Sequence, residues 1–332
     1  MNQRLHAQFM NAVTLHQQGR LGEAKAVYET ILKLQPKHAD TLHLLGVIFG
    51  QLGQPEKAVE FIGQAFKQNP KNLDYLSNYG HALFRLGRFE DALKQYENFR
   101  SIQPNLAKAY ESYANALQAL KRYDEALENY NQSIALDPNA AEGYSNRGAL
   151  FQAHQQYDAA ILDYDRAISI KPSFVDAHHN RGNVMRKLGR QEEAEKSYRN
   201  TLALEPNYPY LLGDYINTKL WLCDWSNYHQ QVSELTSSIE HDIKCSSPFW
   251  VITLIPSLAI QYQATKFWAM EKYPENPSLG ALIKRSGFNK IRIGYFSADF
   301  HHHATSLLMA ELFERHDRDS FELFAFSFGP SQ

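Results

Sequence analysis

Prolines recur at a constant interval along most of this chain. They lie 34 residues apart, at Pro36, Pro70, Pro104, Pro138, Pro172 and Pro206. Three further columns keep the same phase: small residues (Ala12, Gly46, Gly80, Ala114, Gly148, Gly182), alanines (Ala24, Ala58, Ala92, Ala126, Ala160, Ala194) and bulky residues (Tyr28, Ile62, Tyr96, Tyr130, Tyr164, Tyr198). A single globular core produces no such register, so the spacing predicts an array of six stacked units.

Each unit is predicted to fold as two helices. The small residue on the first helix lets the second helix approach closely, and the alanine on the second helix meets it. Each bulky residue follows its alanine by four positions, which places both on one helical face, and we expect it to pack against the next repeat. The proline then ends the unit, because it cannot continue the helical hydrogen bonding.

The repeat length of 34 residues is that of the tetratricopeptide module. One helical pair cannot bury its apolar face alone, so stacked repeats share a continuous core and wind into a superhelix with a concave inner wall. The predicted fold class is therefore mostly α, with six tetratricopeptide repeats in a right-handed superhelix over residues 1–206. The concave wall is predicted to bind a partner.

Composition narrows the choice of partner. The formal net charge is −2, with acidic and basic residues interspersed, which argues against nucleic acid. Residues 1–15 lack the apolar core of a signal peptide, and the longest apolar stretch, residues 248–260, is too short to span a bilayer as a helix. We therefore expect protein or small-molecule partners, no membrane partner and a cytoplasmic location. The only cysteines, Cys223 and Cys245, lack metal-site spacing.

The 34-residue phase ends after Pro206, and residues 207–289 are predicted to form a helical connector. Helices are expected over residues 211–225 and 228–241, and the apolar segment 249–270 is expected to be largely helical. The connector holds all four tryptophans of the chain, which we expect to lie in its core: Trp221, Trp225, Trp250 and Trp268.

The pattern changes again over residues 290–332. Apolar side chains alternate along residues 290–297, which predicts a strand. A polar loop at 299–304, a helix over about 305–315 and a buried strand over 321–328 are predicted to follow. Strand, helix and strand form the right-handed crossover that opens a doubly wound, Rossmann-like sheet. Because ligands bind outside the carboxyl ends of such strands, the loop is a candidate site.

Three consecutive histidines, His301, His302 and His303, occupy this loop. Neighbouring residues on an extended loop point in different directions, and no acidic or cysteine partner has zinc spacing, so no metal site is predicted. A histidine at a helix N-terminus feels the positive end of the helix dipole, which disfavours its protonation. Such an imidazole can accept a proton or polarise a ligand oxygen. On the residues alone, a catalytic histidine and a solvent-exposed loop histidine are equally supported.

The stretch Arg-Ile-Gly-Tyr-Phe-Ser-Ala-Asp-Phe at 292–300, followed by His303, Thr305-Ser306 and Leu308-Met309, resembles the start of the catalytic domain of the protein O-GlcNAc transferase family. Cys-Asp-Trp at 223–225 is similar to another element of that family. The resemblance implies tetratricopeptide repeats joined to a GT-B glycosyltransferase of two Rossmann-like lobes. It implies transfer of N-acetylglucosamine from UDP-GlcNAc, a donor substrate, to serine or threonine of proteins, with no metal or other cofactor.

By position, His303 matches the active-site histidine of the family, which lies beside the donor sugar and the acceptor hydroxyl, so the resemblance implies a catalytic role. His301 and His302 replace less basic residues, and Ala304 stands where proline is frequent. Asp299 is interpreted as fixing the loop. The UDP-binding residues of the family lie mostly in its second lobe, so no cofactor-binding residue is predicted. Two lobes need several hundred residues, and we interpret residues 290–332 as an incomplete first lobe without turnover of its own.

The family also lines its groove with asparagines that hold the backbone of extended acceptor peptides. Asn78, Asn146 and Asn180 share one repeat position, so the resemblance implies that they face the groove, where an amide can both donate and accept hydrogen bonds. The same position holds Met10, Leu44 and Ser112 in the other repeats. Asparagines that bond neighbouring repeats are the structural alternative.

Two other functions stay open at this point. The repeats can act as a non-catalytic scaffold that binds extended peptides or helices, with a vestigial strand, helix and strand unit. Alternatively, the sugar-nucleotide chemistry is retained and the acceptor is different, for example an asparagine side chain. The sequence predicts no oligomeric state.

Overall fold

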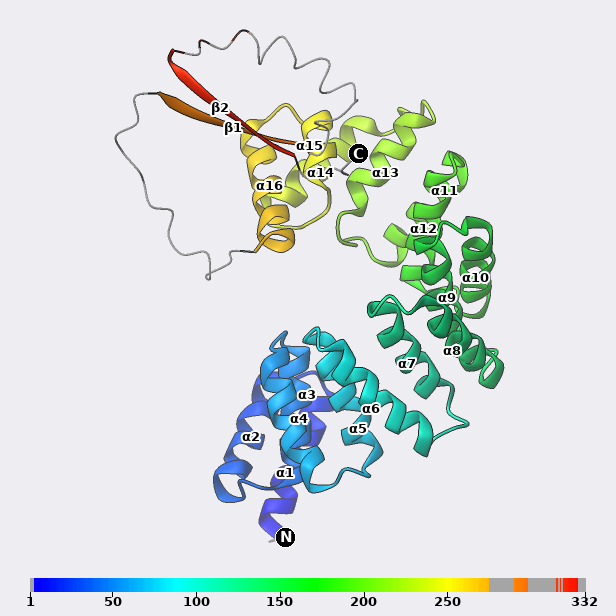
Figure 1. The fold of residues 1–332 in the computed structure, drawn as a ribbon, viewed down its shortest axis with the longest axis vertical. Coiled ribbons are helices and arrows are strands. Elements are labelled where there is room, and N and C mark those ends of the chain that lie inside the picture. Colours follow the sequence, from blue (N-terminus) through cyan, green and yellow to red (C-terminus); the bar gives the residue numbers. More distant parts are fainter. Residues whose placement is uncertain (1–2, 275–289, 298–314, 316, 318, 328–332) are drawn as a thin grey trace. The chain divides into compact units, whose positions relative to one another are not determined.

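The computed structural model describes residues 3–274, 290–297, 315, 317 and 319–327. The chain divides into two compact units, Met1–Tyr273 and Pro274–Gln332. In the described residues, the first unit is helical and the second consists of a strand pair (Figure 1).

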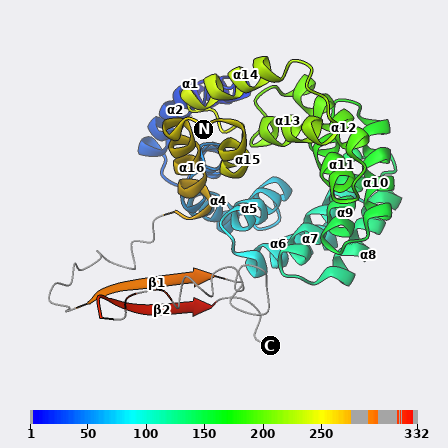
Figure 2. The same ribbon diagram turned by 90° about the horizontal axis from the view of Figure 1, so that it is seen from above.

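The first twelve helices form six consecutive pairs that match the six predicted repeats. Each helix packs on its partner, and the second helix of each pair packs on the first helix of the next pair. Figure 2 shows the pairs following one another along a curved path. This arrangement confirms the predicted, mostly helical tetratricopeptide superhelix. The pairs are α1 Gln3–Gln17 with α2 Leu21–Leu34, α3 Ala39–Gln51 with α4 Pro55–Gln68, α5 Leu73–Arg85 with α6 Phe89–Ile102, α7 Ala107–Ala119 with α8 Tyr123–Leu136, α9 Ala141–Ala153 with α10 Tyr157–Ile170, and α11 Val175–Lys187 with α12 Gln191–Leu204.

The turn inside each repeat requires one residue in the left-handed backbone region. Glycine supplies it in four repeats, with φ between 71° at Gly53 and 79° at Gly87. Lys121 and Gln155 adopt the same conformation in repeats four and five, with φ of 62° and 59°. Glycine is thus favoured in this turn without being required, and the two other side chains are held there against their intrinsic preference.

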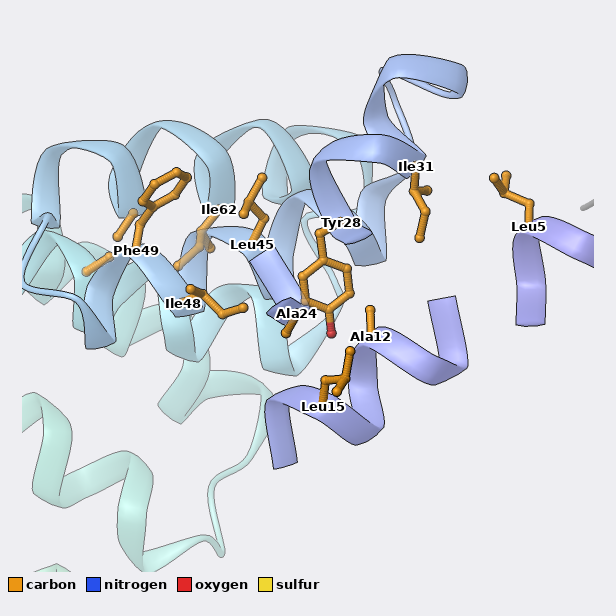
Figure 3. Close-up of a cluster of buried hydrophobic side chains, with 12 residues drawn as sticks. Leu5, Ala12, Leu15, Ala24, Tyr28, Ile31, Leu45, Ile48, Phe49 and Ile62 are labelled. Carbon is orange, nitrogen blue, oxygen red and sulfur yellow. The ribbon is translucent and has the colours of Figure 1, made fainter. Parts of the chain in front are cut away.

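The small residue of each first helix lies under the bulky residue of its own repeat. A methyl group on Gly80 would lie 2.7 Å from the Tyr96 ring, and one on Gly46 would lie 2.6 Å from Ile62. Figure 3 shows the Tyr28 ring directed toward the first helix of its own repeat. The prediction that the bulky residues pack against the next repeat was therefore incomplete. Each bulky residue lies on the same helical face as the alanine four positions before it, and this face also meets the first helix of the same repeat.

Four further helices follow the repeats within the first unit: α13 Leu211–Trp221, α14 Tyr228–Glu240, α15 Pro248–Leu254 and α16 Leu258–Lys272. They share a core that includes Ile216, Leu235 and Val251. The apolar segment predicted as largely helical is interrupted between α15 and α16, where Pro256 lacks a backbone donor.

The prediction that the tryptophans lie in the core was wrong for two of them. Trp221 and Trp225 are 71% and 61% exposed. Trp250 does pack against the core of the connector, and its indole N–H donates to Asp214 Oδ1 at 2.7 Å. Aromatic content alone does not distinguish the two faces of a helix.

The described part of the second unit is a parallel strand pair, β1 Ile291–Ser297 and β2 Phe321–Ser327. The register places Ile291 opposite Phe321 and Ser297 opposite Ser327. Both strands lie where the sequence predicts them, and their parallel pairing is the one that a crossover connection produces. The helix expected over about 305–315 lies outside the described residues.

Candidate functional site: hollows between the repeats

Two hollows open between neighbouring repeats at equivalent positions, three repeat lengths apart. The first has a volume of about 290 Å³ and is lined by α3, α4 and α5. The second has a volume of about 280 Å³ and is lined by α9, α10 and α11. In both, the first helices of two successive repeats form opposite walls, so the superhelical stacking itself creates the space.

The first hollow has an apolar floor and a polar rim. Gly50, Ala58 and Ile62 contribute to the floor, and a methyl group on Gly50 would lie 3.7 Å from the Ala58 Cβ, an ordinary contact. Asn78 and Arg85 line the hollow from α5. Because Gly50 carries no side chain, the space above it is left open.

A histidine shares the rim of the first hollow with Arg85. His81 lies one turn before Arg85 on α5. Loss of surrounding water, and then the positive charges of Arg85 and Lys108, lower the pKa of His81. Arg85 and Lys108 therefore both place positive charge near His81.

The second hollow repeats this plan with different residues. Asn180 and Lys187 stand where the first hollow has Asn78 and Arg85. Tyr164 lies in its wall and donates to Gln152 Oε1 at 2.9 Å, so this phenol is already satisfied. Lys187 lies over the ring of Tyr157, with 5.8 Å between Nζ and the ring centroid.

The asparagines predicted to hold a peptide do not all lie in hollows. Asn78 and Asn180 line the two hollows, whereas Asn146 lines neither. The Asn78 amide is 2.8 Å from His43 Nε2, and the Asn146 amide donates to Glu111 Oε1 at 3.1 Å. Both bonds reach the first helix of the preceding repeat, as the structural alternative expects. An amide has two donors and two acceptor lone pairs, so each retains capacity for a ligand.

The partners of these asparagines are themselves buried. His43 is 6% exposed, and burial lowers its pKa, against the opposing charges of Asp74 and Asp40. The Asn78 amide can donate only to a neutral imidazole whose Nε2 carries no proton. Glu111 is also 6% exposed, and its carboxylate is compensated by Lys108 Nζ at 2.7 Å.

The polar side chains that accept hydrogen bonds from the buried tyrosines were not predicted from the sequence. Tyr130 donates to Asn115 Oδ1 at 2.6 Å, and Tyr198 donates to Asn183 Oδ1 at 2.8 Å. Asn115 and Asn183 share one repeat position, 15 residues before their tyrosines, so the register contained the signal. In the first repeat that position holds valine, and the buried Tyr28 hydroxyl has no hydrogen-bond partner among the described residues.

The Cys-Asp-Trp element forms the turn after α13. Asp224 accepts hydrogen bonds from the hydroxyl and backbone N–H of Ser226, which, together with Lys219 at 3.2 Å, lower its pKa to about 2. Lys219 is 5% exposed and also donates to the Ser226 carbonyl at 2.9 Å. The element thus closes a tight turn around a buried ammonium group.

The candidate catalytic loop lies outside the described residues. His303, His301, His302 and Asp299 all fall between β1 and β2 in the sequence, in the range 298–314 that the structure does not describe. Within the described ranges, no group of three or more His, Cys, Asp and Glu side chains is placed to hold a metal ion. Over the same ranges, none of the helices combines the length and apolar character needed to cross a membrane.

Models of known families match most of the chain in pieces. Tetratricopeptide repeat models match residues 175–208 and, as "TPR repeat", 114–155 and 153–189. The model "Psidin, N-terminal TPR repeats region" matches residues 2–92. The model "Glycosyl transferase family 41" matches residues 279–332. The chain therefore combines tetratricopeptide repeats with a C-terminal segment that resembles a glycosyltransferase.

One curated relative matches part of the chain. The chain is 29% identical over 130 residues to the Arabidopsis thaliana protein "Probable UDP-N-acetylglucosamine--peptide N-acetylglucosaminyltransferase SEC". The match covers 34% of this chain and 13% of the length of that relative.

Solved structures show the fold. A tetratricopeptide repeat protein from Parabacteroides merdae is similar with a TM-score of 0.58 at 15% identity, over 80% of this chain and 98% of that one. The type IV pilus biogenesis factor PilW is similar with a TM-score of 0.55 at 19% identity, over 62% of this chain and 96% of that one.

Proposed function

We propose that the protein is a glycosyltransferase of the protein O-GlcNAc transferase type, which transfers N-acetylglucosamine from UDP-GlcNAc to serine or threonine hydroxyls. The observation that carries this proposal is the order of parts. Tetratricopeptide repeats extend to Pro206, and a segment similar to glycosyl transferase family 41 occupies residues 279–332. The Arabidopsis relative is named as a probable peptide N-acetylglucosaminyltransferase, and this name supports the same reaction.

In this proposal His303 is the catalytic residue. It follows β1 in the chain, and ligands of parallel sheets bind beyond the carboxyl ends of the strands. The imidazole accepts the proton of the acceptor hydroxyl while the hydroxyl oxygen bonds to the anomeric carbon of the sugar, and UDP leaves with the electron pair of the broken bond. No metal ion is assigned a role.

The repeats form the acceptor-recognition arm of the proposed enzyme. Asn78 and Asn180 line two hollows between repeats, where their amides can pair with the backbone of an extended polypeptide of any sequence. Asn146 is assigned the same role. Its bond to Glu111 uses one amide N–H, and the second N–H and the amide oxygen can pair with the peptide backbone.

The test uses the protein expressed from the complete reading frame that encodes this chain. It is incubated with UDP-N-acetyl[³H]glucosamine and a peptide pool that contains serine and threonine, and with a matched pool that contains alanine instead. We expect label on serine or threonine only, and a loss of about a hundredfold or more for His303→Ala, with Lys94→Gln as an unaffected control. Absence of label from both pools and from co-purifying proteins would contradict the proposal, and label on asparagine would replace the acceptor.

A non-catalytic scaffold is the alternative. It is favoured by one observation, that both hollows are built wholly from the repeats. Under this alternative the protein binds extended peptides, Asn78→Ala and Asn180→Ala weaken that binding, and UDP-GlcNAc neither binds nor is consumed. Calorimetric titration with UDP-GlcNAc distinguishes the two functions.

A further inference from the structure

The two hollows share a feature that the other repeats lack. The repeat position of Arg85 and Lys187 holds Gln17, Gln51, Ala119 and Ala153 elsewhere. Only repeats three and six therefore combine an asparagine at the repeat position of Asn78 with a cation seven residues later on the same helix. In both repeats this pair lines the hollow against the preceding repeat.

The cations of the hollows are uncompensated. Among the described residues, neither Arg85 nor Lys187 forms an ion pair with a carboxylate, although many other cations of the repeats do, for example Arg147 with Asp163 at 2.7 Å. None of the residues that line either hollow is acidic. A carboxylate that enters a hollow therefore meets a positive charge and no repulsion from the walls.

The hollow also fits the rest of an acidic side chain. The lining of the first hollow is mainly apolar and includes Ala58 and Ile62, and the more polar lining of the second hollow still includes Ala149 and Ala153. The methylene groups of glutamate can lie on these apolar side chains while the carboxylate reaches the cation, and the asparagine amide is left for the peptide backbone.

We propose that the two hollows are specificity pockets for acidic side chains, foremost glutamate, of an extended polypeptide that lies along the repeats. This inference deepens the proposed acceptor-recognition role by naming the chemistry that the arm selects. It concerns binding alone, so it can be tested without the transfer reaction.

The test measures binding of the full 332-residue chain to two fluorescein-labelled peptide pools by anisotropy, in the absence of UDP-GlcNAc. Both pools carry amidated C-termini and random Ala, Ser, Thr and Val positions. One contains glutamate at fixed positions, and the other contains glutamine there. The amide removes the terminal carboxylate, so any preference for the first pool arises from side chains.

We expect the unmodified chain to bind the glutamate pool more tightly than the glutamine pool. Arg85→Gln and Lys187→Gln should each reduce this preference about threefold, which is within the range for a single exposed ion pair, and the double variant should abolish it. Higher salt should weaken glutamate binding in the unmodified chain and have less effect in the double variant.

Matched controls lie on the second helices of the same repeats. Lys94 and Lys196 occupy one repeat position on α6 and α12, are exposed, and line neither hollow. Lys94→Gln with Lys196→Gln removes the same charge from the chain and should preserve the preference. An equal loss in this control would mean that net charge, not the hollows, attracts acidic peptides, and would overturn the proposal.

A second variant tests whether binding needs the open space of the first hollow, while the charge of the hollow stays the same. Gly50→Phe introduces a large side chain whose Cβ would lie at an ordinary 3.7 Å from the Ala58 Cβ, so the backbone should accept it. It should fill the first hollow and weaken glutamate binding there while Arg85 stays in place. Equal binding of the two pools to the unmodified chain would refute the specificity pockets and leave the proposed transfer reaction untouched. Retention of the preference, together with absence of sugar transfer by the protein expressed from the complete reading frame, would refute only the enzyme.

Discussion

The ring of Tyr198 lies against the backbone of Gly182, so closely that a methyl group on this glycine would be 2.5 Å from the tyrosine ring. The two residues belong to the two helices of the sixth repeat, α11 and α12. The same contact recurs between Gly148 and Tyr164 at 2.9 Å. In the fifth and sixth repeats, the distance between the two helices is therefore set by glycine and tyrosine together.

Gly182→Ala should consequently destabilise the protein by about 1–3 kcal/mol, because the added methyl group overpacks a fully buried contact. Gly22→Ala is the matched control, since a methyl group there has no neighbour within 4 Å and the residue lies inside α2. Because Gly22 is the second residue of α2, the control should feel only part of the preference of helix interiors for alanine and should gain up to about 0.5 kcal/mol. Urea unfolding followed by circular dichroism measures both, and equal stabilities for the two variants would show that the contact is not tight.

Tyrosine hydroxyls should contribute to stability only where a partner holds them. Tyr198→Phe removes the donor to Asn183 Oδ1 and should cost about 1–2 kcal/mol. Tyr28→Phe removes a buried hydroxyl that has no partner among the described residues, and should be neutral or stabilising by up to about 1 kcal/mol. Thermal unfolding of the two single variants makes the comparison, and similar losses for both would indicate that the Tyr28 hydroxyl is bonded in solution.

The register of the sequence predicts the helices and their small and bulky columns well, because a fixed phase of 34 residues specifies which face of each helix is buried. It did not predict which helix each face meets. That choice depends on three-dimensional stacking, and for this reason the contact between Gly182 and Tyr198 was predicted incompletely. The exposure of Trp221 has the same cause. Even for a helix rich in apolar residues, the sequence does not show which face lacks a packing partner.

The candidate site was predictable to a different degree. Asn78 and Asn180 follow from one repeat position, and a resemblance to a known family singled them out. The pairing of each with a cation, Arg85 or Lys187, was not predicted, because the two residues line one hollow only when the preceding repeat is stacked against them. His303 stays a prediction from resemblance, since it lies outside the described residues.

The stability of the second and third repeats should depend on the protonation of His43. Burial lowers the pKa of this imidazole from its ordinary value of 6.5, so the unfolded chain binds the proton more readily. The free energy of unfolding should be constant above this value and should fall as the pH drops through it, until the folded state is protonated too. In the neutral ring, Nε2 can accept from the Asn78 amide N–H at 2.8 Å, and on protonation this nitrogen becomes a donor.

The measurement compares the unmodified chain with His43→Gln between about pH 8 and pH 5. The variant lacks the titrating group, and its amide can still reach Asn78, so its stability should fall less over this interval. His6→Gln, at an exposed position of α1, serves as the control and should keep the slope of the unmodified chain. Identical slopes in His43→Gln and the unmodified chain would show that other groups cause the pH dependence.

The turn of the fourth repeat should be improved by glycine. Lys121 has a φ of 62°, a backbone conformation that costs an L-residue about 1–2 kcal/mol, whereas Gly53 occupies the equivalent turn of the second repeat. Lys121→Gly should raise the free energy of unfolding by about 0.5–1 kcal/mol after the greater flexibility of unfolded glycine is deducted. Gly53→Ala should lower it by about 1 kcal/mol, and because a methyl group there has no neighbour within 4 Å, this loss reports backbone strain alone. Urea unfolding of both variants decides the matter, and a loss of stability in Lys121→Gly would mean that the lysine side chain holds this turn.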